Sequence, residues 1–433
     1  MILTAKNHPY LSKDQETVPL RLGINGLGRI GKLNLWHHAS RRSFEGLVVN
    51  VGREVGRSLQ HLADYVERDS TYGALNRYIH GFRGGPAIEE VDETKGTMRV
   101  NGVPVTVLRE HRNPKDIRWK EHHVELVVDC TGVFRDPTAP ADAPGGSLRG
   151  HLAAGAKKVI LSAPFKIRDK SKSVPEDAVT NIQGINEEAY VAGKHLLISG
   201  ASCTTTCLSF MVKPLLDRLG PEPILSASMV TVHATTGGQE ILDQPPAAGS
   251  DDLRKNRSTF NNIILTTTGA ADALGQVIPA MKGMAFVAES VRIPTSTGSI
   301  VVLTLNMQDD PENPMTREKI NDIYREAAAG YLGKYVSYSD SQNVSSDIVG
   351  TAAAAIIEGR ETRAHTSRIK VNLSNACRII TSGQPVREVE GSVLEIPVTR
   401  VVVYGWYDNE MGSFCNILGE TTKRIAKSLL PSP

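Results

Sequence analysis

A cysteine that follows a predicted strand is the first candidate for chemistry in this chain. Residues 195–199 form an apolar run typical of a buried strand, and the small and hydroxyl residues 200–207 come next. They lead toward a helix that begins near Leu208, which places Cys203 at the helix N-terminus. Unpaired backbone N–H groups and the helix dipole favour a thiolate there, so the pattern predicts a nucleophile.

A histidine thirty residues further along is a candidate base for this thiol. His233 ends a β-branched run and is followed by Ala234, Thr235 and Thr236. A single cysteine more often fills a core, and a single histidine is more often structural. The hypothesis that Cys203 and His233 form a catalytic pair therefore needs support from the rest of the chain.

A glycine motif near the N-terminus supplies that support. Residues 20–25 form a short strand pattern, Gly26-Leu27-Gly28-Arg29-Ile30-Gly31 follows, and a helical stretch leads to a second strand at 46–51. In this βαβ order the glycines permit a tight turn and a close approach to a pyrophosphate at the helix N-terminus. The alternative is a glycine-rich turn in some other α/β protein.

With both regions in view, the chain resembles the phosphorylating glyceraldehyde-3-phosphate dehydrogenases. The matching segments occur in order along nearly the whole chain: 23–31, 127–134, 154–164, 202–205, 231–234, 252–257, 267–271, 283–286, 292–295 and 406–410. One such match would be chance, whereas ten in the same order are specific.

The composition fits a cytoplasmic protein. The 433 residues suit two or three domains, and a net charge of +2 implies no general attraction to nucleic acid or to a membrane. Five irregularly spaced cysteines do not indicate a disulfide framework, and no apolar run is long enough to span a bilayer. We expect no metal site.

Alternating strand and helix patterns predict an α/β fold with a Rossmann-type doubly wound parallel sheet over residues 19–201. The resemblance implies that an α+β catalytic domain with a mostly antiparallel sheet occupies residues 202–412. It also implies that a C-terminal helix within 413–433 packs back on the nucleotide-binding domain, and that the protein is a homotetramer. Residues 1–18 read as a polar extension. Strands are expected at 103–108, 124–128, 159–162, 196–199, 224–233, 284–293 and 299–307, and helices at 316–331 and 417–430.

Three segments lengthen the chain relative to the family pattern. They are a Pro/Ala/Gly loop at 137–146, the residues 287–290, and a long segment at about 357–398. The last contains two strand-like runs around a turn-rich centre. We expect a surface hairpin there, because loops tolerate insertions at small cost. The alternative is an added contact with another subunit or a partner.

The resemblance implies covalent catalysis. Cys203 attacks the aldehyde, and His233 serves as the base while hydride leaves for the nicotinamide ring. Inorganic phosphate then attacks the resulting thioester. Cys207 lies one helical turn beyond Cys203 and is the alternative nucleophile, although we expect it to be structural.

Binding roles also follow from the resemblance. Arg292 and Thr236 match the substrate-phosphate ligands, and Arg254 and Arg257 would add positive potential nearby. Residues that match the inorganic-phosphate site are Ser202, Thr204, Thr268 and Gly269. Residues that match the NAD or NADP site are Gly26, Gly28, Arg29, Ile30, Gly31, Arg112, Ser162 and Asn409.

Several positions depart from the family pattern. Val51 follows Asn50 where the family has an aspartate that holds the adenine ribose, and Arg53 stands nearby. An arginine can accommodate a 2′-phosphate, so the cofactor preference between NAD and NADP stays open. The other departures lie near the expected substrate and nicotinamide sites: Gly200, Thr206, Gly238, Met411 and Ser413.

Three functions are compatible with these residues. The first is phosphorylating oxidation of glyceraldehyde 3-phosphate to 1,3-bisphosphoglycerate, with the small-molecule substrate and inorganic phosphate as partners. The second is oxidation of another phosphorylated aldehyde such as erythrose 4-phosphate, and residues 267–269 favour the first over it. The third is a non-catalytic scaffold, which the presence of Cys203 and His233 disfavours.

Overall fold

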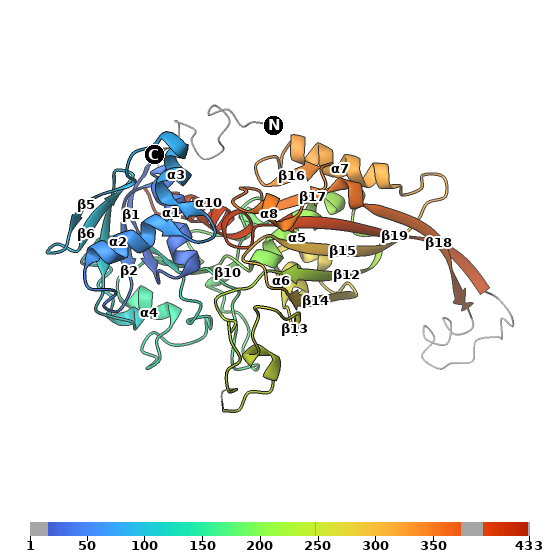
Figure 1. The fold of residues 1–433 in the computed structure, drawn as a ribbon. Helices are drawn as coiled ribbons and strands as arrows, with labels where there is room; N and C mark the ends of the chain where they lie inside the picture. The colour runs from blue at the N-terminus through green and yellow to red at the C-terminus, as the bar shows by residue number, and fades with distance from the viewer. Residues whose placement is uncertain (1–15, 247, 374–392, 432–433) are drawn as a thin grey trace.

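Two β-sheets with separate hydrophobic cores form the two halves of the molecule (Figure 1). The computed structural model describes residues 16–246, 248–373 and 393–431. In the first sheet the strand order is β10-β11-β9-β8-β1-β2-β7-β6-β5. The strands from β10 to β7 are parallel, whereas β6 is antiparallel to β7 and β5 is antiparallel to β6.

The central strands of this sheet are nearly continuous apolar runs, because helices and loops cover both faces of a parallel sheet. The strands are β1 (Val18–Asn25), β2 (Phe44–Asn50), β5 (Ile88–Asp92), β6 (Thr97–Val100), β7 (Val103–Leu108), β8 (Val124–Asp129), β9 (Lys158–Leu161), β10 (Ala178–Thr180) and β11 (Leu197–Ser199). The helices are α1 (Arg29–Arg41), α2 (Leu59–Glu67), α3 (Leu75–His80) and α4 (Leu148–Ala153), and the short strands β3 (Arg68–Asp69) and β4 (Gly73–Ala74) pair with each other.

The second sheet has the order β13-β14-β12-β15-β19-β17-β16, and β18 pairs with β19. Two neighbouring pairs, β12 with β14 and β16 with β17, are parallel, and the other pairs are antiparallel. The strands are β12 (Ile224–His233), β13 (Ile264–Thr266), β14 (Phe286–Arg292), β15 (Ser299–Gln308), β16 (Val336–Ser339), β17 (Ala355–Glu358), β18 (Arg363–Asn372) and β19 (Val393–Tyr407).

Helices cover one face of this second sheet. Phe210 of α5 and Tyr324 of α7 are fully buried in one cluster with Leu303 of β15. Side-chain caps start both helices: Ser202 accepts from the N–H of Thr205, and Thr316 does the same at α7. The helices of this half are α5 (Cys203–Leu219), α6 (Ala270–Val277), α7 (Arg317–Ala329) and α8 (Ser345–Ile348).

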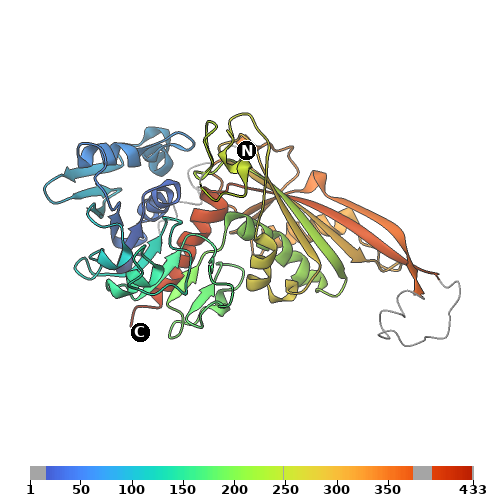
Figure 2. The same cartoon turned by 90° about the horizontal axis from the view of Figure 1, so that it is seen from below.

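The C-terminal helix α10 (Ile417–Lys427) returns to the first half, where it lies beside the first sheet (Figure 2). Leu418 and Ile425 are buried in the same cluster as Leu22 and Ile24 of β1. A π-helical turn (Met411–Asn416) connects β19 to α10. The last strand of the second sheet is therefore tied directly to the core of the first.

The expected fold class is confirmed, and each strand and helix that the sequence predicts overlaps an observed one. Strand β1 already begins at Val18, inside the segment that we expected to be an extension, and residues 1–15 lie outside the described residues. Residues 287–290 lengthen strand β14, which pairs with β12 without a register shift.

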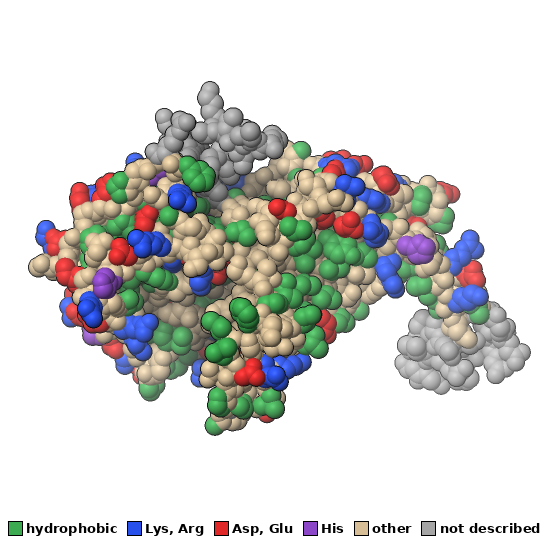
Figure 3. All heavy atoms as spheres, in the orientation of Figure 1, with side chains coloured by type: hydrophobic (Ala, Val, Ile, Leu, Met, Phe, Trp, Pro, Cys, Tyr) green, Lys and Arg blue, Asp and Glu red, His purple; other side chains and the backbone are tan. Residues whose placement is uncertain are grey.

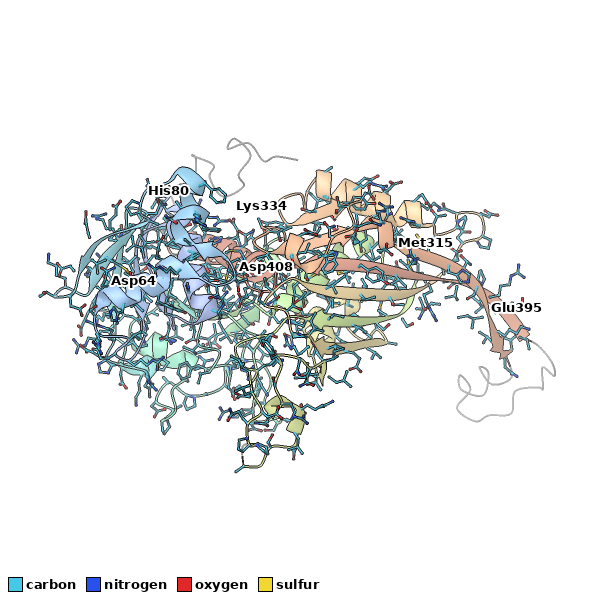
Figure 4. All side chains as sticks on the ribbon, viewed as in Figure 1. Asp64, His80, Met315, Lys334, Glu395 and Asp408 are labelled. Atoms are coloured by element: carbon cyan, nitrogen blue, oxygen red, sulfur yellow. The ribbon has the colours of Figure 1, made fainter. Side chains whose placement is uncertain are left out.

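The expected hairpin is present: β18 and β19 pair over ten residues and project from the second sheet (Figures 1 and 2). The expected turn-rich centre of this insertion lies outside the described residues. Glu395 marks the projecting part of the hairpin, far from Asp408, which lies between the two sheets (Figure 4).

Candidate active site

A left-handed residue sets up the start of helix α5. Ala201 has a φ of 59° and is fully buried, and its N–H donates to Oγ of Ser199 over 3.1 Å. This conformation is unfavourable for a residue with a Cβ atom and is found where the surroundings enforce it. It turns the chain sharply from β11 into α5, so that Cys203 becomes the first residue of the helix.

Cys203 and His233 are brought together as expected. Sγ of Cys203 lies 3.3 Å from Nε2 of His233, and Nδ1 of His233 lies 2.7 Å from the carbonyl oxygen of Ala234. A carbonyl can only accept, so Nδ1 carries the proton and Nε2 presents its lone pair to the thiol. The imidazole is therefore in the tautomer that a base for Cys203 requires.

The charge state of this pair is set by burial and by one arginine. Burial and the positive charge of Arg292 lower the pKa of His233 to about 3. Burial raises the pKa of the Cys203 thiol, while the charge of Arg292 acts in the opposite direction. Burial thus favours a neutral thiol hydrogen-bonded to a neutral imidazole, in place of the expected thiolate.

Tyr407 holds the two elements of the pair together. Its buried hydroxyl bonds to Thr204 of α5 at 3.0 Å and to Thr231 of β12 at 2.8 Å, and its ring packs edge-on against His233. The hydroxyl of Thr204, expected to bind inorganic phosphate, is thus used inside the protein. That of Ser202 likewise caps α5 by accepting from the N–H of Thr205, which leaves the N–H groups of Cys203 and Thr204 for an anion.

The expected substrate-phosphate ligands lie beside the pair. Arg292 is directly opposite His233 in the parallel β12–β14 pairing, and its Nη1 donates to the carbonyl of Ala234 over 3.1 Å. Thr236 and Arg257 line one pocket with Arg292. Arg254 does not line it, and its exposed side chain pairs with Asp252.

Thr268 and Gly269 lie at the start of α6, which packs against α5. Oγ1 of Thr268 accepts a hydrogen bond from the N–H of Ala270 over 3.3 Å, and Gly269 is the N-cap. No hydrogen bond within the described ranges joins them to Ser202. Cys207 is fully buried, and burial raises its pKa far above the ordinary value, in line with the expected structural role.

The glycine motif forms a cradle that fits a dinucleotide. Gly26 has a φ of 90°, and a Cβ atom on Gly31 would lie 1.9 Å from the carbonyl oxygen of Gly26. A Cβ atom on Gly28 would meet nothing within 4 Å, and no side chain caps α1. The first-turn N–H groups of Arg29 and Ile30 are thus available to a pyrophosphate. The Arg29 side chain itself binds Asp69 and Glu410.

Two hydroxyl groups orient the amide of Asn409, the residue expected to bind the nicotinamide. Its Oδ1 accepts hydrogen bonds from Ser299 at 2.9 Å and from Thr297 at 3.1 Å. The Nδ2 donor is left for a ligand carbonyl. Ser162 directly follows β9, and its N–H donates to the carbonyl of Asp129 over 2.9 Å.

The adenosine end of the cradle has no carboxylate among its described lining residues. Val51, Arg53 and Arg112 line this pocket with Asn50. Nε of Arg112 donates to the carbonyl of Gly52 over 3.3 Å. The nearest acid along the chain, Glu54, is exposed, pairs with Arg109 and lines a different pocket.

Sequence reasoning missed a buried hydrogen-bonded chain below the glycine motif. Nε1 of Trp119 donates to Nδ1 of His151 over 2.9 Å, so Nε2 of His151 carries a proton and donates to Asp129 over 3.0 Å. Asn25 also donates to Asp129, and it accepts from Asn50. The available signal was that Asn25, Asn50 and Asp129 each end a strand.

Other departures from the family pattern have structural explanations. A Cβ atom on Gly200 would lie 2.6 Å from Cδ1 of Leu418, so an asparagine there would require the Leu418 side chain to move. Ser413 donates to the carbonyl of Cys203 over 2.8 Å and thereby ties the π-helical turn to α5. Met411 is buried in the first core. Nothing in the structure explains Gly238.

No cluster of three or more His, Cys, Asp or Glu side chains in the described ranges could hold a metal ion. Among the helices of the same ranges, none is both long enough and apolar enough to cross a bilayer.

Comparison with known proteins connects this geometry to one family. Residues 20–137 match the family model for the NAD binding domain of glyceraldehyde 3-phosphate dehydrogenase, and residues 202–374 match that for its C-terminal domain. The chain is 34% identical over 412 residues to glyceraldehyde-3-phosphate dehydrogenase 2 of Streptomyces avermitilis, covering 95% of this chain and 99% of the relative. It is 36% identical over 407 residues to glyceraldehyde-3-phosphate dehydrogenase of Borreliella burgdorferi, covering 94% and 100%. The chain therefore belongs to the glyceraldehyde-3-phosphate dehydrogenase family.

Proposed function

We propose that this protein catalyses the reversible phosphorylating oxidation of glyceraldehyde 3-phosphate to 1,3-bisphosphoglycerate. The observation that carries the proposal is the 3.3 Å contact between Cys203 and His233 at the start of α5, with Arg292 alongside. A nucleophile, a base in the required tautomer and a cation for the substrate phosphate lie in one place. A non-catalytic scaffold has no need of this arrangement.

The first stage forms a covalent bond to the substrate. Sγ of Cys203 attacks the aldehyde carbon while Nε2 of His233 takes the thiol proton and returns it to the substrate oxygen, giving a thiohemiacetal. When bound, the nicotinamide cofactor supplies the hydride acceptor. His233 takes the hydroxyl proton as the carbonyl re-forms, which leaves a thioester on Cys203.

The second stage releases the product. An oxygen of inorganic phosphate attacks the thioester carbon, and the bond to sulfur breaks to give the acyl phosphate and the Cys203 thiolate. The N-terminus of α5 stabilises both the developing oxyanion and the departing thiolate. The expected inorganic-phosphate ligands of this step are Ser202, Thr204, Thr268 and Gly269.

We propose further that the enzyme accepts NADP as well as NAD. The support is the adenosine pocket, where Val51 replaces a carboxylate and Arg53 and Arg112 supply positive charge. A 2′-phosphate would gain charge-assisted hydrogen bonds from guanidinium groups and would meet no repelling acid. Comparable kcat/KM values for NADP and NAD are expected, and a strong preference for NAD would contradict this part of the proposal.

The division into a nucleotide-binding domain (19–201) and a catalytic domain (202–412) remains our proposal, supported by the separate sheets and cores. We also propose a homotetramer. Hydrophobic side chains gather over β12, β14 and β15 on the outer sheet face (Figure 3), where Val230 and Val287 are exposed. Four free cysteines among the described residues support a cytoplasmic location.

The first experiment follows nicotinamide reduction with glyceraldehyde 3-phosphate and inorganic phosphate, with wild-type protein and Cys203→Ser. Phosphate-dependent turnover that the variant loses is the expected result. Cys207→Ser is the matched control, and we expect it to retain turnover. Absence of turnover by folded wild-type protein, or full activity of Cys203→Ser, would overturn the proposed function.

A further inference from the structure

Arg135 is a cation that none of the site assignments above includes. It follows β8 in the nucleotide-binding half, yet it lines the pocket that contains Arg292, Thr236 and Arg257 of the catalytic half. This pocket has a volume of about 390 Å³, within the roughly 300–1,000 Å³ of small-molecule sites. Arg135 is therefore the contribution of one half of the molecule to a pocket built mainly by the other.

The charges around this pocket are unbalanced. No carboxylate is among its described lining residues, and within the same ranges Arg135 has no side-chain hydrogen bond or ion pair. Arg292 donates only to the Ala234 carbonyl, whereas Arg257 pairs with Asp243. Guanidinium groups that are partly withdrawn from water without an acid are unfavourable, and an anion in the pocket would relieve this.

The backbone of Arg135 is fixed in place. Its N–H donates to the carbonyl of Val133 over 3.2 Å, and its carbonyl accepts from the N–H of Lys166 over 2.8 Å. The adjacent Asp136 is occupied, because it accepts from Thr138 at 2.6 Å and from the N–H of Arg168 at 3.1 Å. Asp136, the carboxylate nearest to Arg135 in the sequence, is thus already bound by these donors and does not pair with Arg135.

We propose that Arg135 binds the phosphate group of the aldehyde substrate, together with Arg292 and Thr236. The pocket groups Arg135 with the substrate-phosphate ligands, while Ser202 and Thr268 of the inorganic-phosphate set do not line it. Arg135 is then a specificity residue that favours phosphorylated over unphosphorylated aldehydes. This inference rests on the proposed function, because it concerns the same substrate.

The test compares Arg135→Ala, Arg135→Lys and Arg168→Ala in steady-state kinetics. Arg168 is the matched control, since it lines the neighbouring pocket with Arg135 but not the substrate pocket. Loss of one charge-assisted hydrogen bond should raise the KM for glyceraldehyde 3-phosphate about tenfold in Arg135→Ala. Arg135→Lys should recover part of this, Arg168→Ala should match wild type, and the KM for inorganic phosphate and kcat/KM for unphosphorylated glyceraldehyde should not change.

An unchanged KM for glyceraldehyde 3-phosphate in Arg135→Ala would overturn the inference while leaving the proposed function intact. An equal rise in Arg168→Ala would also overturn it, since the effect would then be a general one of charge. So would a rise confined to the KM for inorganic phosphate. If the wild type shows no turnover, calorimetric binding of glyceraldehyde 3-phosphate to Cys203→Ser, with and without Arg135→Ala, still decides the role of Arg135.

Discussion

The hydroxyl of Ser299 donates a hydrogen bond to Oδ1 of Asn409 over 2.9 Å, and this contact decides which way the Asn409 amide points. The same hydroxyl accepts from the N–H of Ala234, the residue after His233. The amide of Asn409 and the loop that carries the base are therefore held by one side chain. Sequence reasoning did not identify Ser299, because it lies in no recognisable motif and acts only through its hydrogen bonds to other residues.

Ser299→Ala should weaken cofactor binding more than it weakens the fold. The variant leaves Asn409 with Thr297 as its remaining hydroxyl donor, so the amide can rotate. Loss of one neutral hydrogen bond predicts a rise of about fivefold in the KM for NAD. Ser226→Ala is the control, because Ser226 accepts from Asn306 at the far end of β12. Equal KM values for Ser299→Ala and wild type would contradict the positioning role.

Replacing His233 with asparagine should show how much the base contributes to the rate when the nucleophile Cys203 is still present. His233→Asn keeps a side chain of moderate size but leaves no group that can take the proton of Cys203. General-base catalysis contributes roughly 10²–10⁴-fold, so a loss of that order in kcat is expected. Single-turnover measurements of nicotinamide reduction would place the loss in the hydride step. Retention of more than a tenth of the wild-type rate would show that another group takes the proton.

The pH dependence of Cys203 alkylation should report on Arg292. Because the charge of Arg292 favours the thiolate, its removal raises the thiol pKa. The midpoint of the pH profile for iodoacetamide alkylation should therefore move to higher pH in Arg292→Ala. Arg254→Ala removes the same charge outside the pocket and should leave the midpoint unchanged. A downward shift in Arg292→Ala would rule out this electrostatic account.

The elements that could be foreseen were those with a local sequence signal. Strand β12 matches its expected bounds residue for residue, because its alternation and its terminal histidine are both visible in the sequence. The Cys203–His233 pair followed from family motifs. By contrast, the placement of Arg135 beside Arg292 depends on how the two halves meet, and no local pattern encodes it.

Two further features could not be predicted from the sequence, because both depend on the folded surroundings. The left-handed conformation of Ala201 is enforced by its surroundings, whereas sequence would assign such a φ to glycine. The expected thiolate at Cys203 followed from its place at a helix N-terminus and from the partner histidine. The structure adds burial, which raises the pKa of the thiol and lowers that of His233, and burial depends on long-range packing.

His38 should make the protein sensitive to acid. It is buried in α1, neither ring nitrogen has a hydrogen-bond partner in the described residues, and its ring packs edge-on against Phe44. Burial, with the charges of Arg41 and Lys423, lowers its pKa from 6.5 to about 3. The unfolded chain therefore binds more protons between these values, so stability is full above pH 6.5 and falls as the pH drops below it.

His38→Phe should remove the part of this acid dependence that His38 causes, while the buried His233, whose pKa is also lowered to about 3, keeps its own part. At pH 5 the suppressed protonation of His38 lowers the free energy of unfolding by about 2 kcal/mol. Urea unfolding should show that the variant regains this free energy. The gain should shrink as the pH approaches 8. His80→Phe, at an exposed position at the end of α3 (Figure 4), is the control and should not change the slope of stability against pH. A variant that keeps the wild-type slope would show that other groups cause the acid loss.

The glycine motif permits a test that separates folding from cofactor binding. A Cβ atom on Gly31 would lie 1.9 Å from the carbonyl of Gly26, so Gly31→Ala should destabilise the fold by about 3 kcal/mol or more. Gly28→Ala adds the same atom into open space and should change stability by no more than about 1 kcal/mol. That open space is where the pyrophosphate would rest against α1.

We therefore expect Gly28→Ala to unfold at nearly the wild-type urea concentration while binding NAD at least about tenfold more weakly. Calorimetric titration of the folded variant with NAD measures the second quantity without any turnover. Wild-type affinity in Gly28→Ala would place the pyrophosphate away from the N-terminus of α1. A stable Gly31→Ala would mean that the turn between Gly26 and α1 can open, since no other movement accommodates an atom so close to the carbonyl.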